Sequence, residues 1–278
     1  MNAPRIARLC ARSGLLLACA TAPVLVQAAD TVHSLTANVA LTSNYFFRGI
    51  SQTNNGPAVQ GGFDYTYVPA GLYVGLWGSN VDSSSGTGYW VTTQGEQQVL
   101  ASPDTEGAEY VSLAAPGYDG ASMELDIKAG WAHTFDKLGV DIGYVRYEYP
   151  MTDTTANNTN EYHIALSYDV MGYFTPKFTA NFSDDFYGLD ASWYYDLTVA
   201  VPLPYQFNLV GHYGWTRFDN SPNHGGADGY EDYSVSLSRE IYNGVVGTVA
   251  WVDRTNSDAC EPPFQCGNSA VFTLSKTF

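Results

Sequence analysis

"EYHIALSYDVM", residues 161–171, shows the pattern that decides the fold class. Large apolar or aromatic side chains stand at every second position, from Tyr162 to Val170. The positions between them carry small or polar side chains, from Glu161 to Asp169. Because successive side chains of a strand point to opposite faces, this alternation predicts a β-strand with one apolar and one polar face.

The same period recurs along most of the chain. The segments that show it are 36–51, 58–68, 71–81, 122–135, 138–149, 160–171, 173–184, 191–203, 206–218, 229–241, 244–254 and 268–278. A strand of about 11 residues tilted near 45° rises roughly 25 Å, the height of the apolar band of an outer-membrane barrel. The sequence therefore predicts an all-β fold, a closed antiparallel transmembrane β-barrel of about 12 strands.

The connections between these segments alternate in length. The short ones are Pro69-Ala70, Asp136-Lys137, Gly172, Pro204-Tyr205 and Tyr242-Asn243. The others, mostly longer and polar, are 52–57, 82–121, 150–159, 185–190, 219–228 and 255–267. Bacterial outer-membrane barrels have short periplasmic turns and longer extracellular loops, so this alternation favours that class.

A soluble β-sandwich or lipocalin-like barrel also alternates, but it would bury the apolar face. Here that face carries aromatic residues near both strand ends, as the two interfaces of a membrane barrel require. We expect Tyr45, Phe47, Trp193, Trp215 and Trp251 at the outer end, and Tyr67, Trp131, Tyr168, Phe207 and Phe278 at the inner end. The last segment, "AVFTLSKTF" (270–278), resembles an insertion signal, so Phe278 is expected to meet the outer-membrane insertion machinery.

The first 28 residues are typical of a secretory signal peptide. Arg5, Arg8 and Arg12 precede an apolar run at 14–26 that is too short to span a bilayer as a helix. A lipoprotein cleavage site with Cys19 as the lipidated residue is the alternative. In the signal-peptide interpretation, residues 1–28 are removed and residues 29–278 form the barrel in the outer membrane of a Gram-negative bacterium.

Charge and cysteines exclude several classes of function. The whole chain has 12 basic and 28 acidic residues, and three of the basic ones lie in the leader. The rest of the chain therefore has a net charge of −19, which argues against a nucleic-acid partner.

Cys260 and Cys266 are the cysteines that follow the leader, and in an exported protein they predict a disulfide. No His or Cys flanks them as a metal site would require, and we expect no metal and no cofactor.

Four stretches resemble one bacterial family. "LTSNYFFRGISQT" (41–53), "AVQGGFDY" (58–65), "VGLWGSNV" (74–81) and "LGVDIGYVRYEYP" (138–150) look like the TorF family of porins, also described as the Gcw conserved-hypothetical domain. The resemblance runs from about residue 35 to 278 and is most specific in the N-terminal third. It implies an outer-membrane barrel with channel function, and it brings neither catalytic residues nor a defined substrate.

The polar face of a membrane barrel points into the lumen. By strand parity the predicted lumen-lining residues are Asn44, Arg48, Asp64, Glu124, Asp126, Lys128, Asp141, Glu161, His163, Asp169, Lys177, Asp196, His212, Asp232 and Glu240. Nine of these are carboxylates against three cations, and rings of carboxylates favour cations. The alternative is that the acids are paired and that side chains fill the lumen.

Arg48 lies in a stretch that is otherwise apolar. Parity places it in the lumen while its neighbours Tyr45 and Phe47 face lipid. It would then stand opposite Gln60 or Gly62, with Asp64 one diagonal step away. Two roles follow, an ion pair that holds the first hairpin or a contact to the solute.

Three further features leave alternatives open. Segment 82–121 either folds into the mouth as a constriction or forms an extracellular hairpin with arms at 90–93 and 109–113. Arg146 has the parity of the lipid face, where it reaches headgroups, unless a bulge turns it inward. Asp184, Asp185 and Asp190 form either a Ca²⁺ site or a solvated acidic turn.

We expect a channel and no enzyme. The chain has no G-x-S-x-G or H-E-x-x-H motif, and no serine has a supporting base near His133. The predicted function is passive diffusion of small hydrophilic solutes with a preference for cations. The predicted partners of the outer wall are outer-membrane lipid and lipopolysaccharide. A non-conducting structural, adhesin or receptor barrel that acts through its loops is the alternative.

Overall fold

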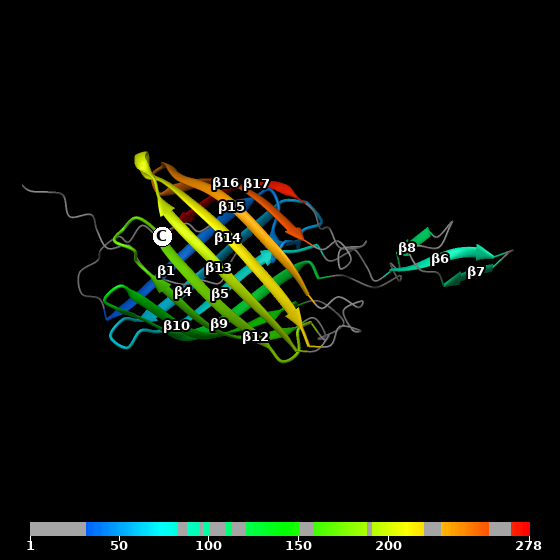
Figure 1. Ribbon diagram of the computed structural model, residues 1–278, viewed down its shortest axis with the longest axis horizontal. Helices are drawn as coiled ribbons and strands as arrows, with labels where there is room; N and C mark the ends of the chain where they lie inside the picture. Colours follow the sequence, from blue (N-terminus) through cyan, green and yellow to red (C-terminus); the bar gives the residue numbers. More distant parts are fainter. Residues whose placement is uncertain are drawn as a thin grey trace, which may run out of the picture.

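The computed structural model describes residues 32–82, 88–94, 97–100, 109–112, 121–150, 158–187, 191–219, 229–255 and 268–278. Within them, twelve strands close into one antiparallel barrel, in which β1 completes the circle by pairing with β17 (Figure 1). The barrel strands are β1 (His33–Thr42), β4 (Ala58–Tyr67), β5 (Leu72–Asn80), β9 (Met123–Phe135), β10 (Leu138–Glu148), β11 (Thr159–Tyr168), β12 (Thr175–Ser183), β13 (Ser192–Pro202), β14 (Phe207–Phe218), β15 (Gly229–Tyr242), β16 (Val245–Thr255) and β17 (Ser269–Thr277).

The predicted strand count is confirmed, and the strands begin and end near the predicted residues. The first segment is the exception, because β1 ends at Thr42 and not at Ser51. The predicted leader, 1–28, and the Cys260–Cys266 pair lie outside the described residues, so both stay predictions.

The barrel has two different ends. We call the end with the short connections the turn end, and the opposite end, from which 82–121 leaves, the loop end. The turn end includes a short 3-10 helix, η1 (Pro204–Gln206), and the chain ends there at Phe278. No helix in the described part of the chain is long and apolar enough to cross a membrane.

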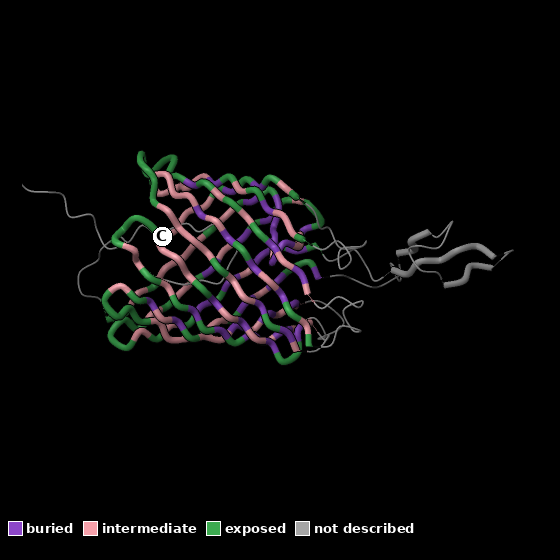
Figure 2. The backbone as a smooth tube through the Cα atoms, viewed as in Figure 1, coloured by how far each residue is buried: buried purple, intermediate pink, exposed green. Residues whose placement is uncertain are grey.

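The outer and inner walls have opposite character. On β11, Tyr162, Ile164 and Leu166 are 45–52% exposed, whereas Glu161 and His163 are at most 8% exposed. The exposed residues alternate with the buried ones along the other strands too, and the buried ones gather toward the loop end (Figure 2). An apolar exterior around a polar interior is the inverse of a soluble barrel and suits a wall that meets hydrocarbon.

Two predicted luminal carboxylates are corrected by the structure, because they serve the turns. Asp169 Oδ1 accepts a hydrogen bond of 2.6 Å from Gly172 N, and Glu240 Oε1 accepts one of 2.9 Å from Gly244 N. Both lie at the turn end, beyond or at the end of a strand, where parity no longer decides direction. Asn243 and Gly244 have φ values of 46° and 78°, as a two-residue type I′ hairpin turn requires.

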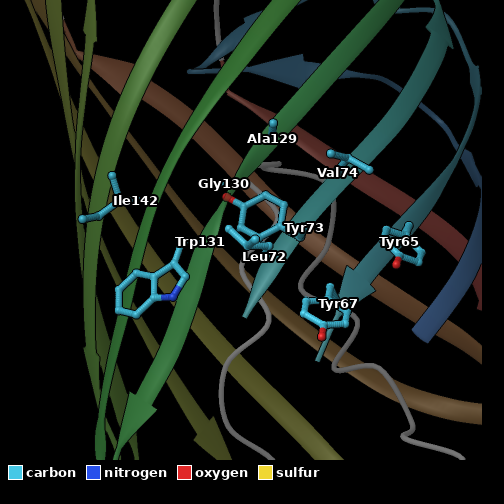
Figure 3. Close-up of a pocket in the computed structure, with 9 residues that line it drawn as sticks. All are labelled: Tyr65, Tyr67, Leu72, Tyr73, Val74, Ala129, Gly130, Trp131 and Ile142. Atoms are coloured by element: carbon cyan, nitrogen blue, oxygen red, sulfur yellow. The ribbon is translucent and has the colours of Figure 1, made fainter. Parts of the chain in front are cut away.

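Aromatic residues cover the outer wall near the turn end. His133 lies between Trp131 and Phe135, with ring centroids 5.9 and 4.5 Å away. A groove opens over Gly130, with Trp131 on one side and Tyr65 and Tyr67 on the other (Figure 3). Most of its lining is apolar and exposed on the outer wall, as at Leu72, Val74 and Ile142, whereas Tyr73 points its hydroxyl inward to Asp141.

Arg146 stays on the outer face of β10. The pairing of β10 with β9 and with β11 runs without a register shift, so no bulge turns this side chain inward. Its Nε donates a 2.6 Å hydrogen bond to Glu148 Oε1, and its Nη1 donates one of 3.0 Å to Asn160 Oδ1. A neutralised arginine near the loop end fits the interface rather than the middle of a membrane.

Within segment 82–121, the described residues form a sheet of their own. Strand β6 (Gly88–Gln94) pairs with β7 (Gln97–Leu100) and with β8 (Glu109–Ser112), and this sheet pairs with no barrel strand. The two predicted hairpin arms thus lie in neighbouring strands, with Trp90 opposite Tyr110. The choice between an extracellular hairpin and a constriction stays a prediction.

Candidate functional site in the barrel lumen

Residues 43–57 fold back into the barrel instead of continuing β1. Two short strands, β2 (Phe46–Phe47) and β3 (Ile50–Ser51), pair around a turn at Arg48 and Gly49, whose φ values are 48° and 75°. We call residues 43–57 the inner hairpin. The predicted lipid-facing positions of Tyr45 and Phe47 are corrected, since Tyr45 is 3% exposed and Phe47 is partly buried inside the barrel.

Asn44 holds the base of the inner hairpin together. Its Oδ1 accepts hydrogen bonds from Ser51 Oγ at 2.7 Å and Thr53 Oγ1 at 3.1 Å, and its Nδ2 donates to Asn55 Oδ1 at 2.9 Å. Gln52 N donates to Tyr45 O at 2.7 Å. Asn44 was predicted to line the lumen from a strand, but it lies in the inner hairpin and its contacts there are internal.

The inner hairpin contacts the barrel wall on several sides. Tyr45 packs with Trp77 of β5 and donates a 3.0 Å hydrogen bond to Glu124 Oε1 of β9. Phe46 packs against Val252 and Val271 of β16 and β17. Because β5 and β9 are separated from β16 and β17 by other strands, the hairpin spans the lumen near the loop end.

Arg48 is bound at the tip of the inner hairpin. Its Nη2 donates to Glu161 Oε1 at 2.6 Å and to Oε2 at 2.8 Å, and both side chains are 2% exposed. The guanidinium carbon lies 4.0 Å from the ring centre of Tyr194, 4.6 Å from Phe47 and 5.5 Å from Phe186. Burial lowers the pKa of Arg48, but Glu161 and the surrounding tyrosines together outweigh it, so the pKa is raised and the charge is kept.

The partner predicted for Arg48 is therefore corrected. Asp64 lies nearer the turn end and pairs with Lys128, whose Nζ is 2.7 Å from Asp64 Oδ1. The prediction extended β1 to residue 51 and so placed Arg48 opposite β4. The hairpin instead carries Arg48 across the lumen to β11, a partner 113 residues away in sequence.

Three more predicted carboxylates lie buried near the inner hairpin. Glu124, Asp126 and Asp232 are at most 5% exposed. Asp126 Oδ1 and Asp232 Oδ2 have no hydrogen-bond partner among the described residues. The region around the tip of the hairpin therefore has more acidic than basic side chains, although Arg254 lies close to Asp232, over the ring of Tyr230 at 3.8 Å.

The remaining predicted residues lie nearer the turn end on the inner wall. His163 Nε2 lies 3.4 Å from Asp141 Oδ1, which also accepts a 2.9 Å hydrogen bond from the hydroxyl of Tyr73. His212 Nε2 lies 2.6 Å from Asp196 Oδ2. Lys177 is on an inward-facing position of β12 and is partly buried. Seven of the nine predicted carboxylates thus lie on inward-facing positions, since Asp169 and Glu240 serve turns.

Sequence reasoning missed the aromatic part of this site. Four aromatic residues surround Arg48: Tyr147, Tyr187, Tyr194 and Phe186. Of these, Tyr147 also donates a 2.9 Å hydrogen bond to Glu161 Oε2. Strand parity does put Tyr147 and Tyr194 on inner faces, but the predicted lumen lining included only charged residues, histidines and one asparagine. The signal for the inner hairpin was also in the sequence, as Arg48-Gly49 and Asn54-Asn55-Gly56 are turn sequences.

The described residues hold no group of three or more His, Cys, Asp or Glu side chains that could bind a metal ion. Asp184 and Asp185 of the predicted Ca²⁺ site are exposed, and Asp190 lies outside the described residues. The interactions that the described luminal side chains make are ion pairs, hydrogen bonds and cation–π contacts.

The tip of the inner hairpin requires glycine. A Cβ atom at Gly49 would lie 2.9 Å from both Asp232 Cβ and Arg254 Cβ, and the φ of 75° disfavours any other residue. Gly172 has the same φ with nothing within 4 Å, so it is a matched control. We expect Gly49→Ala to lower the free energy of unfolding by about 1–3 kcal/mol more than Gly172→Ala, measured by urea titration in lipid vesicles. Equal losses would show that the tip is not packed against the wall.

The geometry defines a class of protein, a 12-stranded barrel with an apolar exterior and a charged interior. The solved structures of the NanC porin and the KdgM porin have the same fold. The match to NanC has 7% identity and a TM-score of 0.50 over 88% of this chain and 99% of that chain. The match to KdgM has 6% identity and a TM-score of 0.50 over 87% and 98%.

The chain belongs to the bacterial protein family of unknown function Gcw_chp, whose model matches residues 26–278. This confirms the Gcw part of the resemblance, while the narrower TorF assignment stays a prediction. No curated protein matches the chain.

Proposed function

We propose that this protein is an outer-membrane channel for passive diffusion of small hydrophilic solutes and that it prefers cations. The observation that carries the proposal is the inward-facing set of seven carboxylates behind an apolar outer wall. Two of them, Asp126 and Asp232, keep an oxygen without a partner among the described residues. Such a lining attracts cations and repels anions.

The orientation and surroundings follow from the same proposal. The turn end faces the periplasm, where a secreted chain arrives, and the loop end faces outward. Lipid and lipopolysaccharide surround the outer wall, and Arg146 with Glu148 reaches their headgroups. The final strand, with Phe278, meets the insertion machinery.

The inner hairpin limits conduction in this proposal. It spans the lumen near the loop end, and the buried Arg48–Glu161 pair holds its tip. The described arrangement is then the closed state of the channel, and the hairpin leaves the lumen when the channel opens.

A salt gradient across a planar bilayer tests the proposal. With potassium chloride more concentrated on one side, the current through open channels is expected to reverse at a potential that has the sign of the potassium equilibrium potential. The double variant Asp141→Asn/Asp196→Asn removes two luminal charges and should move the reversal potential toward zero. Asp253→Asn is the control, because that carboxylate bonds to exposed Tyr233 on the outer face. A reversal potential set by chloride would overturn the cation preference.

A non-conducting barrel is the second candidate, and the hairpin across the lumen is the observation that favours it. Such a barrel would act through its loops as a structural protein, adhesin or receptor. It predicts no conductance steps and no uptake of solutes into liposomes, even after the hairpin is loosened by Gly49→Ala.

A further inference from the structure

We propose that Glu161 with the rings of Phe186 and Tyr194 forms a binding site for organic cations that carry a guanidinium or primary ammonium group. In the described state Arg48 occupies this site, and a solute cation opens the channel by displacing it. This inference rests on the proposed channel function and adds to it the class of solute and the means of opening.

The site has the features of a cation receptor. Glu161 receives one nitrogen of the guanidinium on both of its oxygens, at 2.6 and 2.8 Å, which a primary ammonium can also do. The rings of Tyr194 and Phe186, which do not belong to the inner hairpin, lie 4.0 and 5.5 Å from the guanidinium carbon. Aromatic faces attract organic cations strongly once water is excluded. Hydrated metal ions gain less from such a site, which distinguishes it from the rest of the acidic lumen.

Arg48 fits the site incompletely. Its Nη1 atom is buried and has no hydrogen-bond partner among the described residues. A buried donor without a partner weakens binding, because the water it had in solution is not replaced. A primary ammonium has three N–H donors instead of five and avoids this loss, and a guanidinium that is not tethered is free to turn its donors toward water.

Arg48 is also tethered in a way that allows displacement. The hydrogen bonds that organise the inner hairpin lie at its base, among Asn44, Ser51, Thr53 and Asn55. At the tip, only two residue pairs form the ladder between β2 and β3. A short tether gives a resident group an effective concentration in the mM range, so a competing solute should act at roughly mM concentrations.

The experiment compares two probes of the same shape. Single-channel recordings of the full-length protein in potassium chloride are made with butylguanidinium and with neutral butylurea, each added on the loop side. We expect butylguanidinium to raise the open probability with a half-maximal effect at roughly mM concentration. Butylurea should leave it unchanged. These wild-type recordings require no variant and therefore do not depend on the folding of one.

The variant Arg48→Met should reverse the sign of the effect. Its site is empty and its channel opens without a ligand, so butylguanidinium now enters the site and reduces the potassium current. In this background Tyr194→Phe keeps the ring and should keep the block, whereas Tyr194→Leu should weaken it about tenfold or more, as expected for loss of a desolvated cation–π contact.

The outcomes separate this inference from the proposed function. Cation-selective conductance with equal effects of butylguanidinium and butylurea would overturn the inference and leave the channel in place. Absence of conductance in the wild type, with both probes, and in Arg48→Met would overturn both.

Discussion

Replacing Glu161 by glutamine is expected to lower the free energy of unfolding by about 3–5 kcal/mol, because it leaves the guanidinium of Arg48 buried without a counter-charge. Both side chains of this pair are 2% exposed. The double variant Arg48→Met/Glu161→Gln removes both charges and should recover most of the loss, since a neutral pair carries no uncompensated ion. Urea titration of the wild type, Glu161→Gln, Arg48→Met and the double variant in lipid vesicles measures this coupling.

The Arg146–Glu148 pair is the control for this prediction. It has the same N–O distance of 2.6 Å, but its side chains are 30% and 33% exposed. We expect Glu148→Gln to cost less than about 1 kcal/mol, as for other exposed pairs. If Glu161→Gln cost as little, water would reach the Arg48 site and the lumen would be open at the inner hairpin.

Ile164→Arg is expected to lower the stability of the barrel in lipid by about 2–4 kcal/mol, because it places a charge on the outer wall at mid-strand. Ile164 is 47% exposed, lies at the middle of β11 and pairs with Ile142, which is 50% exposed. In a soluble protein an arginine at such an exposed position would change stability by no more than about 0.5 kcal/mol. The size of the loss therefore reports whether hydrocarbon covers this wall.

Met171→Arg is the matched control on the outside of the barrel. Met171 is 76% exposed and lies in a connection at the turn end, beyond the strands. The same unfolding measurement should give a change within about 0.5 kcal/mol for this variant. Equal and small effects of both substitutions would contradict a membrane-spanning wall.

The barrel itself was predictable because its cause is local and repeated. Alternation in β11, from Glu161 to Tyr168, depends only on the two-residue period of a strand, and it tells which side chains share a face without knowledge of the neighbours. The short turns, such as Asn243-Gly244, fix antiparallel pairing in order along the chain. These signals are enough for twelve strands and a closed topology.

The site was less predictable because parity gives a direction but no partner. Asp141, His163 and Asp196 face inward as expected, and their registers follow from the hairpins. Glu161 was placed correctly too, but nothing local connects it with Arg48. The end of β1 at Thr42 was the decisive error, because beyond it the rule that placed Tyr45 and Phe47 on the lipid face no longer applies.

The sequence by itself determined a barrel with an acidic interior, since strand period, turn residues and charge counts are properties of neighbouring residues. Only the tertiary structure decided that residues 43–57 cross the lumen and that Arg48 meets Glu161, Tyr194 and Phe186. The physical reason is that a closed barrel brings strands far apart in sequence around one narrow space. A buried arginine in that space contacts a carboxylate and aromatic rings that lie far from it in sequence. No local stretch of sequence contains these partners together.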